Sequence, residues 1–245
     1  MRLAHQLLNF FFPPRCAGCD ARLPLESDQR VCALCLGRIG RLDGSLCDRC
    51  GVPVPGFEDG GGHRCARCLE SPPSFRKARA IAAYEAHAEA ENSVLASMIR
   101  RYKYGPNQSM GCAIAECLGN DLPVYADDYD LVIPVPLHPS RLRWRGFNQA
   151  ALLAAPVARR LGCKLDVGSL IRVVPTTPQT AKDIQTRRRN VRNAFAVKRP
   201  ARIANRRVLL IDDVMTTGAT ANECARALRA AGARSVDVLT LARVL

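Results

Sequence analysis

The sequence has no long apolar stretch, few aromatic residues and a deficit of acidic ones. No window reaches the roughly 18 apolar residues that a membrane-spanning helix needs, so no spanning segment is expected. Polar residues interrupt residues 1–14, which favours a short amphipathic helix ended by proline over the alternative of an export signal. We therefore expect a cytoplasmic protein. Aromatic residues make up 5% of the chain, which leaves few side chains for stacking on nucleic-acid bases.

The 245 residues include 36 Lys and Arg but only 22 Asp and Glu, which gives a net charge of +14. Most of the excess lies after residue 78. Such a charge favours a polyanionic partner, either a phosphorylated metabolite or a nucleic acid or both. An arginine-rich surface that is merely well solvated is the alternative.

The composition changes along the chain. Residues 15–75 are rich in Cys, Gly, Pro and Arg. A segment so short and poor in apolar residues needs bound metal ions or disulfide bonds to fold. From about residue 79, apolar strands alternate with amphipathic helices, which predicts an α/β fold with a parallel sheet. Strands are expected at 80–84, 130–137, 170–174, 194–197, 208–211 and 235–244, and helices at 89–102, 110–118, 148–161 and 220–231.

Eight of the twelve cysteines form four Cys-x-x-Cys pairs, all before residue 69. Two such knuckles separated by a short loop give four thiolates that converge on zinc. Four thiolates leave no coordination position for a substrate, so we expect two structural zinc ions. Pairing of consecutive knuckles makes the shortest loops and is favoured, while reduced or disulfide-bonded cysteines are the alternative. The predicted ligands are Cys16, Cys19, Cys32, Cys35, Cys47, Cys50, Cys65 and Cys68.

One strand–loop–helix segment has the acidic and small residues expected of a ligand-binding site. The apolar run 208–211 predicts a central parallel strand, and two carboxylates, Asp212 and Asp213, follow it. A loop of small residues then leads into a helix, whose backbone N–H groups and dipole suit a monophosphate. The carboxylates would accept hydrogen bonds from a sugar diol, and Mg²⁺ is expected through those hydroxyls or through waters. The segment therefore predicts a ribose 5-phosphate site. Its phosphate-binding residues are Thr216, Thr217, Gly218, Ala219 and Thr220.

Residues 209–220 resemble the PRPP (5-phosphoribosyl 1-diphosphate) motif of type I phosphoribosyltransferases. Nearly the whole chain resembles the ComF family, also called the competence protein F or GntX-like family. The motifs that carry this resemblance are the four knuckles and residues 13–16, 102–105, 134–137, 145–149, 177–180, 187–193 and 209–220. The resemblance implies a double zinc-ribbon domain at 1–76 and a type I phosphoribosyltransferase domain at 77–245. It also implies a role in DNA uptake during natural competence or in the use of DNA as a nutrient.

The resemblance places a pyrophosphate-binding loop after the strand at 130–137. Arg141, Arg143 and Arg145 alternate there, so an extended backbone would put all three on one side as a clamp. A solvated basic loop is the alternative. Residues 176–189 stand where related enzymes carry a flexible hood, and the basic segment 176–207 is equally compatible with a nucleic-acid track or a solvated face.

Three functional hypotheses remain open at this stage. As an enzyme, the chain would transfer phosphoribosyl groups from PRPP, with Asp212 and Asp213 as catalytic residues that orient the sugar beside the developing positive charge. Without turnover, it would be a PRPP sensor or a factor that binds single-stranded DNA. The zinc region would alternatively dock on DNA-uptake proteins.

Overall fold

The computed structural model describes residues 13–245 with several gaps: 28, 43, 57–61, 85–92, 105–110, 112, 115–116, 118–121, 125–127 and 176–190. The hood predicted at 176–189 and most of the helix predicted at 110–118 lie outside the described residues. Within the described part, no helix combines the length and the apolar content that crossing a membrane requires.

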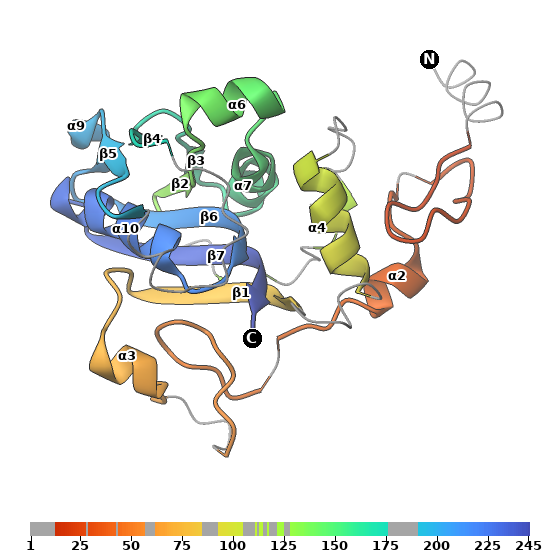
Figure 1. Cartoon of the computed structure of the whole chain (residues 1–245), viewed down its shortest axis with the longest axis horizontal. Helices are drawn as coiled ribbons and strands as arrows, with labels where there is room; N and C mark the ends of the chain where they lie inside the picture. Colours follow the sequence, from red (N-terminus) through yellow and green to blue (C-terminus); the bar gives the residue numbers. More distant parts are fainter. Residues whose placement is uncertain are drawn as a thin grey trace.

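A parallel sheet of five strands, in the order β1-β7-β6-β2-β3, forms the centre of the molecule (Figure 1). Every neighbouring pair is parallel, which confirms the predicted α/β class. β6 is the middle strand, as its continuous apolar run predicts. A separate antiparallel pair joins β4 to β5. The strands are β1 (Lys77–Tyr84), β2 (Leu131–Pro134), β3 (Lys164–Leu165), β4 (Leu170–Arg172), β5 (Phe195–Val197), β6 (Arg207–Met215) and β7 (Ser235–Val244).

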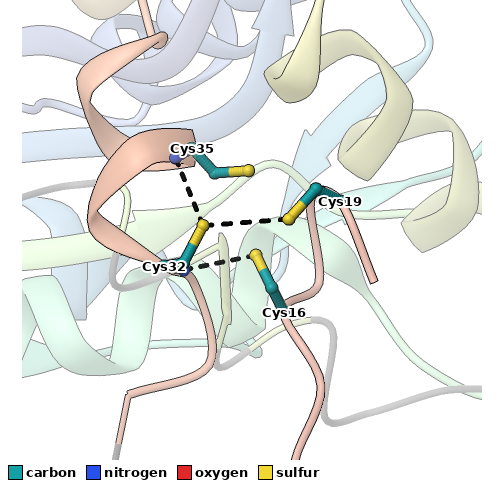
Figure 2. Close-up of side chains that lie close together, drawn as sticks. All are labelled: Cys16, Cys19, Cys32 and Cys35. Carbon is teal, nitrogen blue, oxygen red and sulfur yellow. Dashed lines mark hydrogen bonds between the residues drawn. The ribbon is translucent and has the colours of Figure 1, made fainter. Parts of the chain in front are cut away.

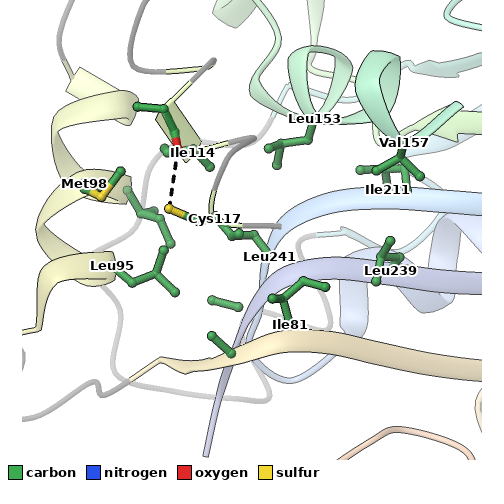
Figure 3. Close-up of a cluster of buried hydrophobic side chains, with 14 of the residues drawn as sticks. Ile81, Leu95, Met98, Ile114, Cys117, Leu153, Val157, Ile211, Leu239 and Leu241 are labelled. Atoms are coloured by element: carbon green, nitrogen blue, oxygen red, sulfur yellow. Dashed lines mark hydrogen bonds between the residues drawn. The ribbon is translucent and has the colours of Figure 1, made fainter. Parts of the chain in front are cut away.

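Helices cover both faces of the sheet. The helices are α2 (Ala33–Gly37), α3 (Ala66–Glu70), α4 (Val94–Tyr104), α6 (Pro139–Arg145), α7 (Gln149–Arg160), α9 (Pro200–Ile203) and α10 (Ala219–Ala230). Side chains alternate along β6, so Leu209 and Ile211 join one buried cluster and Val208 and Leu210 join another. Helices α7 and α4 pack in the first cluster (Figure 3), and α10 packs in the second.

The predicted helix at 148–161 is confirmed as α7, and its first turn shows why it begins where it does. The side chain of Asn148 accepts a hydrogen bond from the backbone N–H of Ala150, so it caps the helix. The same side chain donates to the carbonyl oxygen of Val135, just beyond β2. The cap therefore fixes the start of α7 against the carboxyl end of a central strand.

The cysteine-rich segment shares its packing with the sheet. Residues of the first half, such as Cys16 and Val31, belong to the buried cluster that contains α4. Residues of the second half, such as Cys47 and Cys68, belong to the cluster of β1 and α10. Figure 1 accordingly shows α2 beside α4 and α3 on the side of β1. The predicted domain boundary between residues 76 and 77 stays a prediction.

Candidate functional site

The eight predicted cysteines gather into two tetrads, in each of which the sulfur atoms all lie within 4.8 Å of one another. Consecutive knuckles share a tetrad, as the loop lengths favour. In the first tetrad the sulfur atoms of Cys19 and Cys32 are 3.8 Å apart (Figure 2), and in the second those of Cys50 and Cys65 are 3.7 Å apart. All eight are free thiols in this structure. The tetrads are Cys16, Cys19, Cys32 and Cys35, and Cys47, Cys50, Cys65 and Cys68.

Backbone N–H groups favour the thiolate form of one cysteine in each tetrad. Burial by itself would raise the pKa of Cys16, but N–H groups of Cys32, Cys19 and Gly18 point at its sulfur and lower the pKa to about 6. In the second tetrad the pKa of Cys47 falls to about 6 for the same kind of reason. Four thiolates this close repel one another unless a cation lies between them, and an all-thiolate set fits zinc. Both tetrads therefore support structural zinc.

The strand–loop–helix segment has the predicted order, with one correction. β6 does not end at Ile211 but continues through both carboxylates to Met215. An Asp212 oxygen accepts from the N–H of Asp213 at 2.9 Å, and an Asp213 oxygen accepts from the N–H of Val214 at 2.7 Å. Both side chains are half-buried. The carboxylates are thus anchored by backbone at the carboxyl end of the central strand, where α/β sheets bind ligands.

The loop 216–220 leads into α10 through a glycine in the left-handed conformation. Gly218 caps the helix with φ +76°, and a Cβ there would lie 2.7 Å from Cε of Met215. The N–H of Ala219 donates to Oγ1 of Thr217 at 3.3 Å, which keeps the turn tight. The first turn of this 12-residue helix contains no acidic side chain. Its N-terminal dipole and N–H groups are therefore suited to an anion.

The three arginines after β2 do not lie on an extended backbone. Residues Pro139–Arg145 form helix α6, with His138 at its N-cap, proline in its first turn and Gly146 at φ +79° as its C-cap. On a helix, Arg141 and Arg145 are four residues apart and share a side, whereas Arg143 lies on roughly the opposite side. The expected extended, one-sided arrangement of the three arginines is therefore wrong, whereas their binding of pyrophosphate stays a prediction.

The structure adds one arginine that the sequence reasoning missed. Arg172 lies at the end of β4, and its guanidinium is 5.4 Å from the ring centre of Phe195. Burial lowers the pKa of Arg172, nearby Arg141 lowers it further, and Asp212 raises it. Strand β4 therefore brings a cation into electrostatic range of both Arg141 and a predicted catalytic carboxylate. Its position at the base of the predicted hood was the only signal in the sequence.

A cavity of about 400 Å³ lies between α3, the segment that follows it and α10. Thr217, Gly218 and Ala219 line it, but Asp212 and Asp213 do not. Arg67, in α3, donates a hydrogen bond to the carbonyl oxygen of Thr217 at its wall. The second cysteine tetrad therefore borders the predicted phosphate loop directly, a proximity that the sequence did not indicate.

Comparisons with known proteins agree with this two-part organisation. A double zinc ribbon domain model matches residues 7–69, and a phosphoribosyl transferase domain model matches residues 148–245. The chain is 32% identical to the DNA utilization protein YhgH of Escherichia coli O157:H7, over 91% of this chain and 95% of that one. It is 30% identical to competence protein F of Haemophilus influenzae, over 95% and 98% of the two chains. Adenine phosphoribosyltransferase of Thermoanaerobacter pseudethanolicus aligns at 19% identity over 56% of this chain and 82% of that one, with a TM-score of 0.34.

Proposed function

This chain belongs to the ComF family, and on that premise we propose that its β6–α10 segment binds the ribose 5-phosphate part of PRPP or a related phosphorylated ribose. One observation carries the proposal. Two backbone-anchored carboxylates at the end of the central strand stand directly before a helix N-terminus that is capped by a left-handed glycine. The carboxylates suit vicinal hydroxyls, and the helix N-terminus suits a phosphate.

Different predicted residues would bind the phosphate and the ribose hydroxyls of the ligand. Thr216, Thr217, Gly218, Ala219 and Thr220 would hold the 5-phosphate through backbone N–H groups and hydroxyls. Asp212 and Asp213 would hold the ribose hydroxyls. Their oxygen atoms are also the kind of ligand that Mg²⁺ prefers, so the site fits a magnesium ion that accompanies a pyrophosphate group. Magnesium would supply positive charge to that leaving group.

The proposed reaction is phosphoribosyl transfer. The C1–O bond of the ribose breaks, pyrophosphate leaves with the electron pair, and an acceptor nucleophile bonds to C1. The carboxylates of Asp212 and Asp213 would orient the ring while it becomes positively charged, and arginines would stabilise the departing pyrophosphate. Among the predicted arginines, Arg141 and Arg145 share a helix face and suit this role together. A PRPP sensor without turnover would use the same site.

Isothermal titration calorimetry with PRPP and Mg²⁺ tests the site. Exchange of both carboxylates for amides (Asp212→Asn with Asp213→Asn) should weaken PRPP binding by at least about tenfold, because the amides remove the charge that magnesium and the diol require. Asp128→Asn is the matched control, since Asp128 is exposed and precedes β2. Equal affinity in the double variant and the control would refute the assignment. Pyrophosphate release with candidate acceptors then separates an enzyme from a sensor.

A second function, binding of single-stranded DNA, is favoured by the net charge of +14 and by the relatives that are named for competence and DNA utilization. Fluorescence anisotropy with a labelled oligonucleotide tests it. Affinity should fall as salt rises, by about 0.7 log unit per log unit of salt for each phosphate contact. Absence of binding at low salt would discard this function. Docking on DNA-uptake proteins and a cytoplasmic location stay predictions.

A further inference from the structure

A buried arginine near the end of β7 has two nitrogen atoms that find no partner among the described residues. Arg243, near the end of β7, is only 4% exposed. Its Nε and Nη1 atoms are buried, and within the described residues they have no hydrogen-bond partner. An arginine cannot lose its charge by giving up a proton, and a buried charge is stable only when an opposite charge compensates it. The surroundings of Arg243 should therefore contain a negative charge in the metal-bound protein.

The second cysteine tetrad is the group that faces this arginine. Arg243 pairs in register with Met215 on β6, and Met215 lines the same cavity as Cys50 and Cys68. Burial lowers the pKa of Arg243 and the nearby charge of Arg67 lowers it further, whereas the sulfurs of Cys50, Cys65 and Cys68 raise it. The tetrad is also held tightly to the sheet, because a Cβ at Gly51 would lie 2.6 Å from the carbonyl oxygen of Ala78 on β1.

A zinc ion bound by four thiolates has a net negative charge that can compensate Arg243. Four thiolates carry four negative charges and zinc carries two positive ones, so a Zn(Cys)₄ centre keeps a net charge of −2. A buried guanidinium beside it would neutralise part of that charge and donate N–H groups toward the sulfurs. In the first tetrad, backbone N–H groups of Cys32, Cys19 and Gly18 lower the pKa of Cys16, whereas in the second the charge of Arg243 opposes the rise that burial causes in the pKa of Cys50. The two centres thus differ in their electrostatic environment.

We propose that Arg243 is the buried counter-charge of a zinc centre formed by Cys47, Cys50, Cys65 and Cys68, and that it fixes this centre to the sheet beside the phosphate loop. The residue is a positioning residue that acts through the thiolates. Two ligands of this centre belong to helix α3, because Cys65 is its N-cap and Cys68 lies within it. Arg67 of the same helix donates a hydrogen bond to the carbonyl oxygen of Thr217. The N–H of Ser74 donates to the side chain of Asn222 in α10 at 2.7 Å, which is a second link between the ribbon and the helix.

Release of zinc to an excess of a coloured chelator measures the proposal directly. Mutation of a residue that interacts with the metal ligands, without binding the metal itself, typically lowers metal affinity by about 10–100-fold. In Arg243→Met, which keeps an unbranched, largely apolar side chain but removes its charge, one of the two zinc ions should leave about 10–100-fold faster, while the other keeps its rate. Arg243→Lys retains the charge and should restore most of the slow release. Arg64→Met is the control, because Arg64 is an exposed arginine of the same ribbon.

Two further variants keep the result unambiguous. Cys19→Ser removes a ligand of the first centre, so the release phase that remains belongs to the second centre. Arg243→Gln is neutral but polar, and it replaces the Met variant if that variant does not fold. Unchanged release in the neutral variants, or equally fast release in Arg243→Lys, would overturn the proposal. PRPP takes no part in this assay, so its outcome is independent of the proposed function.

Discussion

The glycine that caps α10 gives a sharp test of the phosphate loop. Gly218 has φ +76°, and alanine in this left-handed conformation costs about 1–2 kcal/mol. Its Cβ would also lie 2.7 Å from Cε of Met215, the flexible end of a side chain, which can move at lower cost. A chain of this size loses roughly 2–4 °C of Tm for each kcal/mol. Gly218→Ala should therefore lower Tm by roughly 2–8 °C.

A second glycine separates the effect on stability from the effect on binding. Gly232 has φ +87°, but the nearest atom to a Cβ there is 3.6 Å away, at Ala204. Gly232→Ala should therefore show a similar loss of Tm in a thermal melt. In calorimetry only Gly218→Ala should also weaken PRPP binding by at least about tenfold, or 1.4 kcal/mol, because the loop N–H groups are displaced. If Gly218→Ala loses stability but binds PRPP like Gly232→Ala, the loop backbone does not hold the phosphate.

The other predictions concern the ribbon and acid stability. Arg67→Ala removes the hydrogen bond to the carbonyl of Thr217 and should weaken PRPP binding severalfold while elemental analysis still finds two zinc ions per chain; wild-type affinity would contradict the link between ribbon and loop. Side-chain and backbone hydrogen bonds from Arg207 lower the pKa of Asp130 to about 2. This pair therefore contributes stability above the ordinary aspartate pKa of about 3.9, and the contribution is lost as pH falls toward 2. The Tm difference between wild type and Asp130→Asn should accordingly be full at pH 7 and narrow below about pH 4; a constant difference would contradict it.

Local signals in the sequence were sufficient for the elements of the candidate site. The apolar run before Asp212 predicted a central strand, and the small residues after Met215 predicted a loop that leads into a helix. β7 has the predicted bounds, and Gly232 lies just after α10 as a helix-ending glycine should. The paired cysteines also specified the tetrads, because a knuckle leaves its two sulfurs side by side whatever surrounds it.

Other features depend on helix capping and on tertiary contacts that spacing alone does not reveal. The arginines after β2 were expected on an extended backbone, but the capping groups at His138 and Gly146 favour a helix. The packing of the ribbons against α4 and β1 could not be predicted, since it depends on how separate segments fit together. Arg172 and Arg243 were missed for the same reason, because each acquires its role only through burial beside residues distant in the sequence.

The central claim is that a ribose 5-phosphate group lies between the end of β6 and the start of α10. A crystal structure of the complex with PRPP and Mg²⁺ measures its position directly. We predict the 5-phosphate within hydrogen-bond distance of the backbone N–H groups of residues 217–220, and the ribose hydroxyls within hydrogen-bond distance of Asp212 or Asp213. Electron density for the ligand elsewhere, away from the N–H groups of residues 217–220 and from both Asp212 and Asp213, would contradict the account.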